Sequence, residues 1–290
     1  MLRSATFVGL LSVALVFGFV AIEGCTGGDG GGSSSGSGSN SGGTGSSKAT
    51  AAPVDEYANV DKATAGTITG KVMFTGTKPA AERLKLDSDE QCEAMAGGED
   101  VFQEHDMVND NGTLGNVVVF IKSGVGDVKF PVPNSPVVLD QKGCRYDPHV
   151  FGVRAGQDIK ILNSDDTLHN INAKPDSNKS FNAAMPKKGM EVTKKFKNPE
   201  VGIYMKCEVH PWMNAWVSVF DHPYFDVTGE AGTFELKNVP AGEYTLEAYH
   251  ERWGKVEAKV KLDAGGTATA DFTYDGSTDG LRHTTVYKKR

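Results

Sequence analysis

The chain has 290 residues, 39% of them hydrophobic, and a formal net charge of −7 at pH 7. Once about the first fifty residues are set aside, the remaining length suits two modest domains. The acidic balance and the lack of a basic face or recognition motif exclude nucleic acid as an expected partner. The sequence also contains no nucleophile elbow, so we do not expect an enzyme.

Residues 1–24 have the pattern of an export signal. One basic residue, Arg3, precedes an apolar run of about 16 residues, fewer than the roughly 20 that span a bilayer. The residues Ile22-Glu23-Gly24-Cys25 resemble a bacterial lipobox, in which cleavage leaves a lipid-modified cysteine. The resemblance implies a lipid anchor at Cys25, on the inner or outer membrane, facing the periplasm or the cell surface. Simple secretion is the alternative, because Glu23 is atypical.

Residues 25–60 are predicted to be a tether, since they begin with a long run of Gly and Ser. From residue 67 onward the chain reads as all-β. Short β-branched segments bounded by Gly, Pro, Asn or Asp predict strands at residues 67–75, 116–121, 158–163, 217–221, 232–236 and 244–249. Residues 79–95 carry the only helix-like composition, without a strong cap, and a long loop is the alternative there.

Cysteine usage separates three roles. With Cys25 assigned to the lipid anchor, an odd number of cysteines remains, namely Cys92, Cys144 and Cys207. Only Cys207 has metal-ligand neighbours, and an oxidising compartment favours pairing of the other two. We therefore predict a Cys92–Cys144 disulfide, which closes a loop of about 50 residues and would disfavour the unfolded chain by roughly 4 kcal/mol.

The segment Tyr204–Met213 concentrates metal-binding side chains. It contains Cys207, His210 and Met213 within seven residues, and soft sulfur donors with imidazole select copper over hard cations. A further histidine, His169, follows the predicted strand at residues 158–163. Zinc is the competing metal, but a thioether at this spacing argues against it.

Residues 146–220 resemble a cupredoxin, and the short Cys-x2-His-Pro-x-Met loop is similar to that of amicyanin within the amicyanin and plastocyanin type. The resemblance implies a Greek-key β-sandwich holding one type 1 (blue) copper ion by His169, Cys207, His210 and an axial Met213. It also implies that Asn170 fastens the two ligand loops, with its backbone N–H toward the thiolate. Pro211 lacks an N–H and would leave the sulfur with one hydrogen bond fewer.

His210 is expected to be the ligand nearest solvent. Trp212, with Met185, is expected to form an apolar patch where a transient redox partner docks, although Trp212 could equally be a core residue.

Residues 225–274 resemble a carboxypeptidase-regulatory-like, transthyretin-like sandwich, whose opening strands would lie far upstream. Gly232 and Gly242 are expected to supply turn conformations, while Phe234, Leu236, Tyr244 and Leu246 alternate toward a core. We therefore predict that residues 67–125 and 225–275 form one sandwich, with a cupredoxin domain at residues 130–223 inserted in it. Domains in series are the alternative, and residues 276–290 are predicted to be a polar tail.

The function that this pattern favours is transfer of single electrons between redox partners outside the cytoplasm. A copper-storage or delivery protein, and a structural lipoprotein with a vestigial metal site, are the alternatives. His149, His222 and His250 raise the possibility of a second metal site, but packing at a domain junction or binding of a surface ion is the simpler expectation.

A thiol count tests the disulfide prediction. Metal-free mature protein, titrated with a thiol reagent under denaturing conditions, should show one free thiol, that of Cys207. Three free thiols would contradict the Cys92–Cys144 pairing, and a Cys207→Ala variant should show none.

Overall fold

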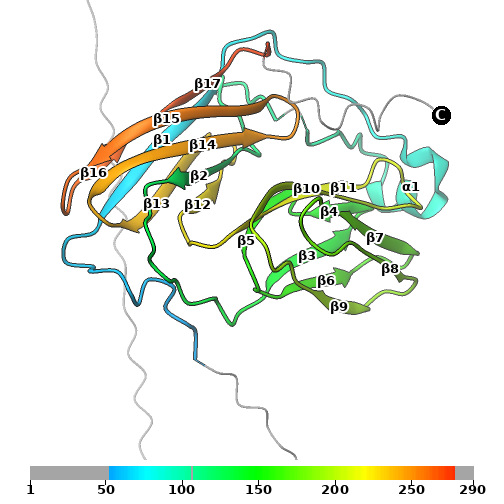
Figure 1. Cartoon of the computed structure of the whole chain (residues 1–290). Helices are drawn as coiled ribbons and strands as arrows, with labels where there is room; N and C mark the ends of the chain where they lie inside the picture. Colours follow the sequence, from blue (N-terminus) through cyan, green and yellow to red (C-terminus); the bar gives the residue numbers. More distant parts are fainter. Residues whose placement is uncertain (1–51, 106, 278–290) are drawn as a thin grey trace, which may run out of the picture. The chain divides into compact units, whose positions relative to one another are not determined.

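The computed structural model describes residues 52–105 and 107–277. The predicted signal, Cys25 and most of the predicted tail lie outside these residues. Strands dominate the described chain, as expected for an all-β protein, and its helices are η1 (Leu86–Ser88) and α1 (Glu90–Ala96) (Figure 1). Neither helix in this part of the chain has the length and hydrophobicity that crossing a bilayer requires.

Two sheets with a common core form what we call the outer sandwich. One sheet has the order β13-β1-β16, with β17 also paired to β1, and the other has the order β12-β2-β14-β15. The strands are β1 (Gly66–Phe74), β2 (Val118–Ser123), β12 (Phe225–Val227), β13 (Thr233–Val239), β14 (Gly242–His250), β15 (Gly254–Leu262), β16 (Thr267–Thr269) and β17 (Phe272–Tyr274).

Alternating side chains build the core of the outer sandwich. Phe234, Leu236, Tyr244 and Leu246 are all buried there, as their spacing predicted. Gly232 has φ +65°, and a Cβ at this position would lie 2.8 Å from the carbonyl oxygen of Val72. A non-glycine residue is therefore excluded at this turn.

A second pair of sheets, here called the central sandwich, contains β3 to β11. Its sheets have the orders β4-β3-β6-β9 and β5-β11-β10-β7-β8. The strands are β3 (Val137–Lys142), β4 (Arg145–Asp147), β5 (Val150–Arg154), β6 (Ile159–Asn163), β7 (His169–Lys174), β8 (Phe181–Met185), β9 (Glu191–Lys194), β10 (Glu200–Lys206) and β11 (Asn214–Phe220).

The strands β2 and β12 pair with each other although the whole central sandwich separates them in sequence. Insertion of one domain in another remains our interpretation of this pairing. Some residues predicted to belong to the tether are instead packed against the folded part of the chain. Val60 belongs to the core of the outer sandwich, and Glu56 forms an ion pair of 3.0 Å with buried Arg154 in β5.

The helix-like segment differs from its prediction. Only residues 86–88 and 90–96 are helical, and α1 does have a strong cap, because the Asp89 carboxylate accepts the N–H groups of Gln91 and Cys92. Gly97 ends the helix in the left-handed conformation with φ 63°.

An ion pair joins the two sandwiches. His149 contacts Glu251 through Nε2 and the carbonyl of Asn214 through Nδ1, at 3.1 Å. Both side chains are almost fully buried. Burial lowers the pKa of His149, but Glu251 outweighs burial and raises it above its usual value. Burial likewise raises the pKa of Glu251, and His149 holds it below its usual value.

This pair should make stability depend on pH. The raised pKa of His149 stabilises the fold below the ordinary value of 6.5, and this contribution is lost as pH rises through the folded pKa. The lowered pKa of Glu251 stabilises it above 4.5, and this contribution is lost as pH falls through the folded pKa. Glu251→Gln should therefore lower the free energy of unfolding by about 3 kcal/mol near pH 6, and by less at alkaline pH.

Denaturant titrations at both pH values measure this difference, with the exposed Glu243→Gln as the matched control. An effect of Glu251→Gln that does not change with pH would contradict the role of the ion pair.

Candidate metal centre

Neighbouring strands bring the sequence-predicted ligands together. His169 begins β7, Cys207 directly follows β10, and these strands pair antiparallel with Asn172 opposite Lys206. His210 and Met213 lie in the tight connection from β10 to β11. Because the buried faces of both strands pack in the central core, the two ligand segments are held at the same end of one sheet.

The donor atoms of three predicted ligands converge. The Nδ1 atoms of His169 and His210 face each other at 3.0 Å, and the Cys207 sulfur lies 3.8 Å from His210 Nδ1. All three residues are buried, with one ligand atom of each within 4.8 Å of the others. Two ring nitrogens this close, beside a thiolate, share either a proton or a cation. The donor set of two imidazoles and one sulfur fits copper.

Met213 closes the same loop. Its N–H donates to the carbonyl of His210 at 3.0 Å, and its carbonyl accepts the N–H of Cys207 at 2.9 Å. Its side chain is buried in the core that also contains Cys207. The loop thus begins and ends at neighbouring backbone positions, which keeps Met213 beside the other three ligands.

The Cys207 sulfur is held as a thiolate. Among the described residues it is bonded to no other cysteine, and it accepts the backbone N–H groups of Val209 and His210, each at 3.4 Å. Burial alone would raise its pKa, but His169, His210 and these two N–H groups lower the pKa to about 6. A deprotonated sulfur at neutral pH is the form that binds metal.

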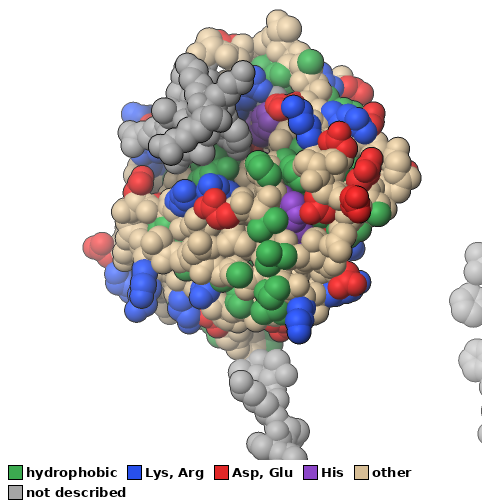
Figure 2. Space-filling model, turned by 90° about the vertical axis from the view of Figure 1, so that its right-hand side faces the viewer, with side chains coloured by type: hydrophobic (Ala, Val, Ile, Leu, Met, Phe, Trp, Pro, Cys, Tyr) green, Lys and Arg blue, Asp and Glu red, His purple; other side chains and the backbone are tan. Residues whose placement is uncertain are grey.

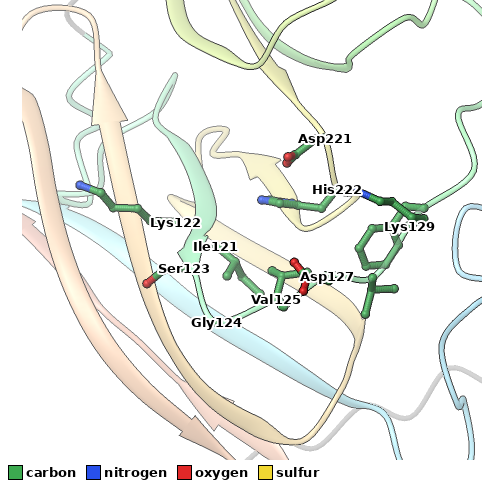
Figure 3. Close-up of a pocket in the computed structure, with 12 residues that line it drawn as sticks. Ile121, Lys122, Ser123, Gly124, Val125, Asp127, Lys129, Asp221 and His222 are labelled. Carbon is green, nitrogen blue, oxygen red and sulfur yellow. The ribbon is translucent and has the colours of Figure 1, made fainter.

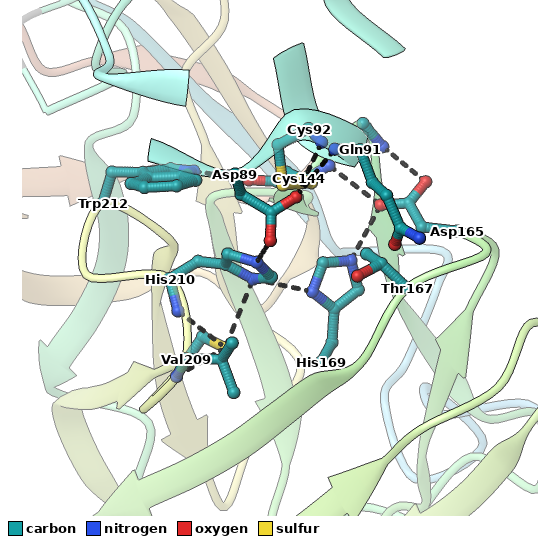
Figure 4. Close-up of a disulfide and its surroundings, with 12 residues drawn as sticks. Asp89, Gln91, Cys92, Cys144, Asp165, Thr167, His169, Val209, His210 and Trp212 are labelled. Atoms are coloured by element: carbon teal, nitrogen blue, oxygen red, sulfur yellow. Dashed lines mark hydrogen bonds and ion pairs between the residues drawn. A yellow bond between two sulfur atoms is a disulfide. The ribbon is translucent and has the colours of Figure 1, made fainter. Parts of the chain in front are cut away.

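Two carboxylates hold the outer edges of the imidazoles (Figure 4). Asp165 lies 2.8 Å from His169 Nε2, and Asp89 lies 3.3 Å from His210 Nε2. Burial raises the pKa of Asp165, but His169 and the N–H groups of Cys144 and Gly143 bring it below its usual value. The N–H of Cys92, followed by His210, lowers the pKa of Asp89 despite partial burial. Each carboxylate thus lies opposite the ring nitrogen that faces away from the other ligands.

Sequence reasoning missed both carboxylates. Asp165 precedes His169 by four residues, a spacing that could have drawn attention to it. Asp89 lies 121 residues before His210, and no local pattern links the two.

Asn170 ties the ligand segments together, the role that the resemblance implies. Its side-chain oxygen accepts the N–H of Glu208 at 2.8 Å, joining β7 to the loop after β10. Its backbone carbonyl accepts the hydroxyl of buried Tyr146. Pro211 is exposed and follows His210 directly, so the loop offers no N–H at this position.

The predicted docking patch is wrong for Met185, and none of the four predicted ligands, His210 included, is exposed. Met185 is fully buried in β8 opposite His169, and His210 is 1% exposed. Trp212 is half-buried and donates its indole N–H to the carbonyl of Cys144 at 3.0 Å. At Trp212 the reason is that η1 and α1 cover this edge, where Leu86, the preceding Leu84 and the disulfide pack against the indole. Met185 is buried for another reason, because its side chain belongs to the core of the central sandwich.

The predicted disulfide is present. Cys92 in α1 is bonded to Cys144 in the turn between β3 and β4. The bond lies beside the ligands, since one ring nitrogen of His210 is within 4.8 Å of both sulfur atoms.

Exposed apolar residues near the site are other than the predicted Trp212 and Met185. Figure 2 shows the side of the molecule that carries α1, where hydrophobic side chains gather in the middle of the face with acidic side chains beside them. The large exposed hydrophobic residues adjoining ligands in sequence are Leu168 and Val209, at 42% and 43% exposure.

A pocket of about 440 Å³ is formed by residues 121–130 with Asp221 and His222, and no predicted ligand lines it (Figure 3). His222 accepts the N–H of Tyr224 at 3.2 Å. Among the described residues, the clusters of His, Cys, Asp and Glu close enough to hold a metal all include His169 or His210, and none includes His149, His222 or His250.

No family model matches the chain, and no curated protein matches it. Solved structures similar to it include an oxidised amicyanin variant, 19% identical, covering 35% of this chain and 98% of that one with a TM-score of 0.28. A purple cupredoxin from Nitrosopumilus maritimus is 21% identical, covering 29% and 99%, with a TM-score of 0.26.

A copper-containing nitrite reductase from Thermus scotoductus SA-01 is 22% identical over 34% of this chain, with a TM-score of 0.26, and the match spans only 25% of that enzyme. At these identities the likeness concerns the fold of part of the chain and says nothing of its activity. The resemblance of residues 225–274 to a transthyretin-like sandwich stays a prediction.

The lowered pKa of Cys207 can be measured directly. In metal-free protein, the ultraviolet absorbance of the thiolate should appear with a midpoint near pH 6, because His169 and His210 stabilise the anion. The Cys207→Ala variant should lack this transition. A midpoint near the ordinary value of 9.0 would contradict the arrangement of donors around the sulfur.

Proposed function

We propose that this chain is a type 1 copper protein that transfers single electrons between redox partners outside the cytoplasm. The observation that carries the proposal is the meeting of two imidazole Nδ1 atoms with an unpaired, buried sulfur of lowered pKa. A thiolate with two imidazoles is the donor set of the blue-copper class, and a copper ion bound by it would supply one-electron redox chemistry. The proposal assigns no catalysed reaction to the chain.

The residues of the site suit this role because they hold the ligands still. Asp165 and Asp89 each contact the outer nitrogen of one ring, and Asn170 links the segments that carry His169 and Cys207. Ligands anchored on paired strands cannot rearrange much between two oxidation states. A site that moves little on gaining or losing an electron supports fast transfer.

The proposed location is outside the cytoplasm, attached to a bacterial membrane through a lipid on Cys25. The Cys92–Cys144 disulfide supports an oxidising compartment. A transient redox partner would meet the protein near Leu168 and Val209, the exposed apolar residues that adjoin His169 and His210.

Spectroscopy of copper-loaded protein tests the proposal. Oxidised wild type should show the intense visible absorption of a thiolate–copper(II) centre, with one copper per chain and reversible bleaching on reduction. Cys207→Ala should remove the colour, while His222→Ala, which alters a histidine in the wall of the separate pocket, should keep it. A colourless wild type that takes up zinc with equal stoichiometry at the same place would refute the redox role.

Release of the metal separates an electron carrier from a storage or delivery protein. A carrier should keep copper in the presence of a competing chelator through repeated redox cycles. Ready loss of copper to the chelator, without a stable oxidised coloured state, would favour storage or delivery.

A further inference from the structure

The edge of the site beyond His210 is covered by a segment from outside the central sandwich. This segment, η1 and α1, lies between β1 and β2 in sequence and so between two strands of the outer sandwich. It reaches the site through Asp89, whose Oδ2 lies 3.3 Å from His210 Nε2. The side chain of His210 is only 2% exposed beneath it.

The Asp89 carboxylate is fixed in its place. Its Oδ1 accepts the N–H groups of Gln91 at 2.9 Å and Cys92 at 3.0 Å, so one oxygen caps α1 while the other meets the imidazole. A carboxylate tied to the helix in this way has little freedom to turn away from His210.

The disulfide anchors the helix above the site. Cys92 is bonded to Cys144, whose N–H donates to Asp165 Oδ2 at 2.8 Å, and the same oxygen contacts His169 Nε2. The Cys144 carbonyl also accepts the indole N–H of Trp212. The partners of both imidazoles are therefore connected through one covalent cross-link.

We propose that Asp89 is a positioning residue for the metal centre: it accepts the Nε2–H of His210 and presents Nδ1 to the metal, on a helix that the Cys92–Cys144 disulfide holds over the ligand. This inference rests on the proposed copper site. An imidazole that donates Nδ1 to a metal carries its proton on Nε2 and, when buried, needs an acceptor there. The negative charge of Asp89 also favours copper(II) over copper(I), so it lowers the reduction potential.

Two variants separate positioning from helix capping. Asp89→Ser retains a capping oxygen but is too short to reach His210, and Asp89→Asn retains the shape but loses the charge. Asp87→Asn, which removes an exposed carboxylate two residues away, is the matched control. Thiol counts and far-ultraviolet circular dichroism verify that each variant keeps the disulfide and the fold.

Affinity and potential give the first readout. Both Asp89 variants should bind copper(II) about 10- to 100-fold more weakly in chelator competition, with a higher reduction potential than Asp87→Asn. If they match Asp87→Asn in affinity and potential while wild type binds copper, Asp89 is only a helix cap and the inference is wrong.

Nuclear magnetic resonance of the metal-free protein gives a second readout that needs no copper. His210 should carry a slowly exchanging Nε2 proton in wild type and in Asp87→Asn, and this proton should be lost to exchange in Asp89→Ser. An unchanged Nε2 proton in Asp89→Ser would overturn the inference. If wild type shows the proton but binds no copper, the positioning contact stands and the proposed function fails instead.

Discussion

Two imidazole rings turn their Nδ1 atoms toward each other at 3.0 Å, beside the sulfur of Cys207 and away from solvent. Holding nitrogen lone pairs and an anion together in a dry interior is costly unless a cation or a proton compensates. Paired strands on one side and two carboxylates on the other hold the three side chains in this arrangement despite its free-energy cost. The sandwich, the ligand loop and the covering helix thus all surround one unfavourable juxtaposition, which a bound cation or a shared proton would relieve.

In each of the two imidazole rings, an inner nitrogen, Nδ1, faces the other ligands and an outer nitrogen, Nε2, faces a carboxylate. Asp165 and Asp89 occupy the outer positions, so each ring has one nitrogen committed to a structural hydrogen bond and one available for coordination. The two acids come from different parts of the chain, one from the loop before β7 and one from the segment before α1. The site consequently includes a residue from the connection between β1 and β2, although all four predicted ligands lie in the central sandwich.

The features that could be predicted from the sequence are those that short-range residue spacing encodes. Alternation along β13 and β14 identified the buried Phe234 and Leu246, and the dense spacing of Cys207 and His210 identified the ligand loop. Cysteine arithmetic identified the disulfide. Exposure near the site could not be predicted in this way, because the burial of His210 depends on a distant segment that covers it, and that of Met185 on which face of β8 turns toward the central core. Asp89 was missed for the same reason, since its contact arises only from tertiary packing.

The pairing of β1 has a consequence for how the chain assembles. Its partners include β16 and β17, and Lys71 donates its N–H to Asp271, 200 residues later. In a chain synthesised from its N-terminus, β1 and β2 have open edges until the last strands are made, whereas every strand of the central sandwich pairs within residues 137–220. The pairing therefore allows the ligand-bearing part to be complete while the sandwich around it is still open.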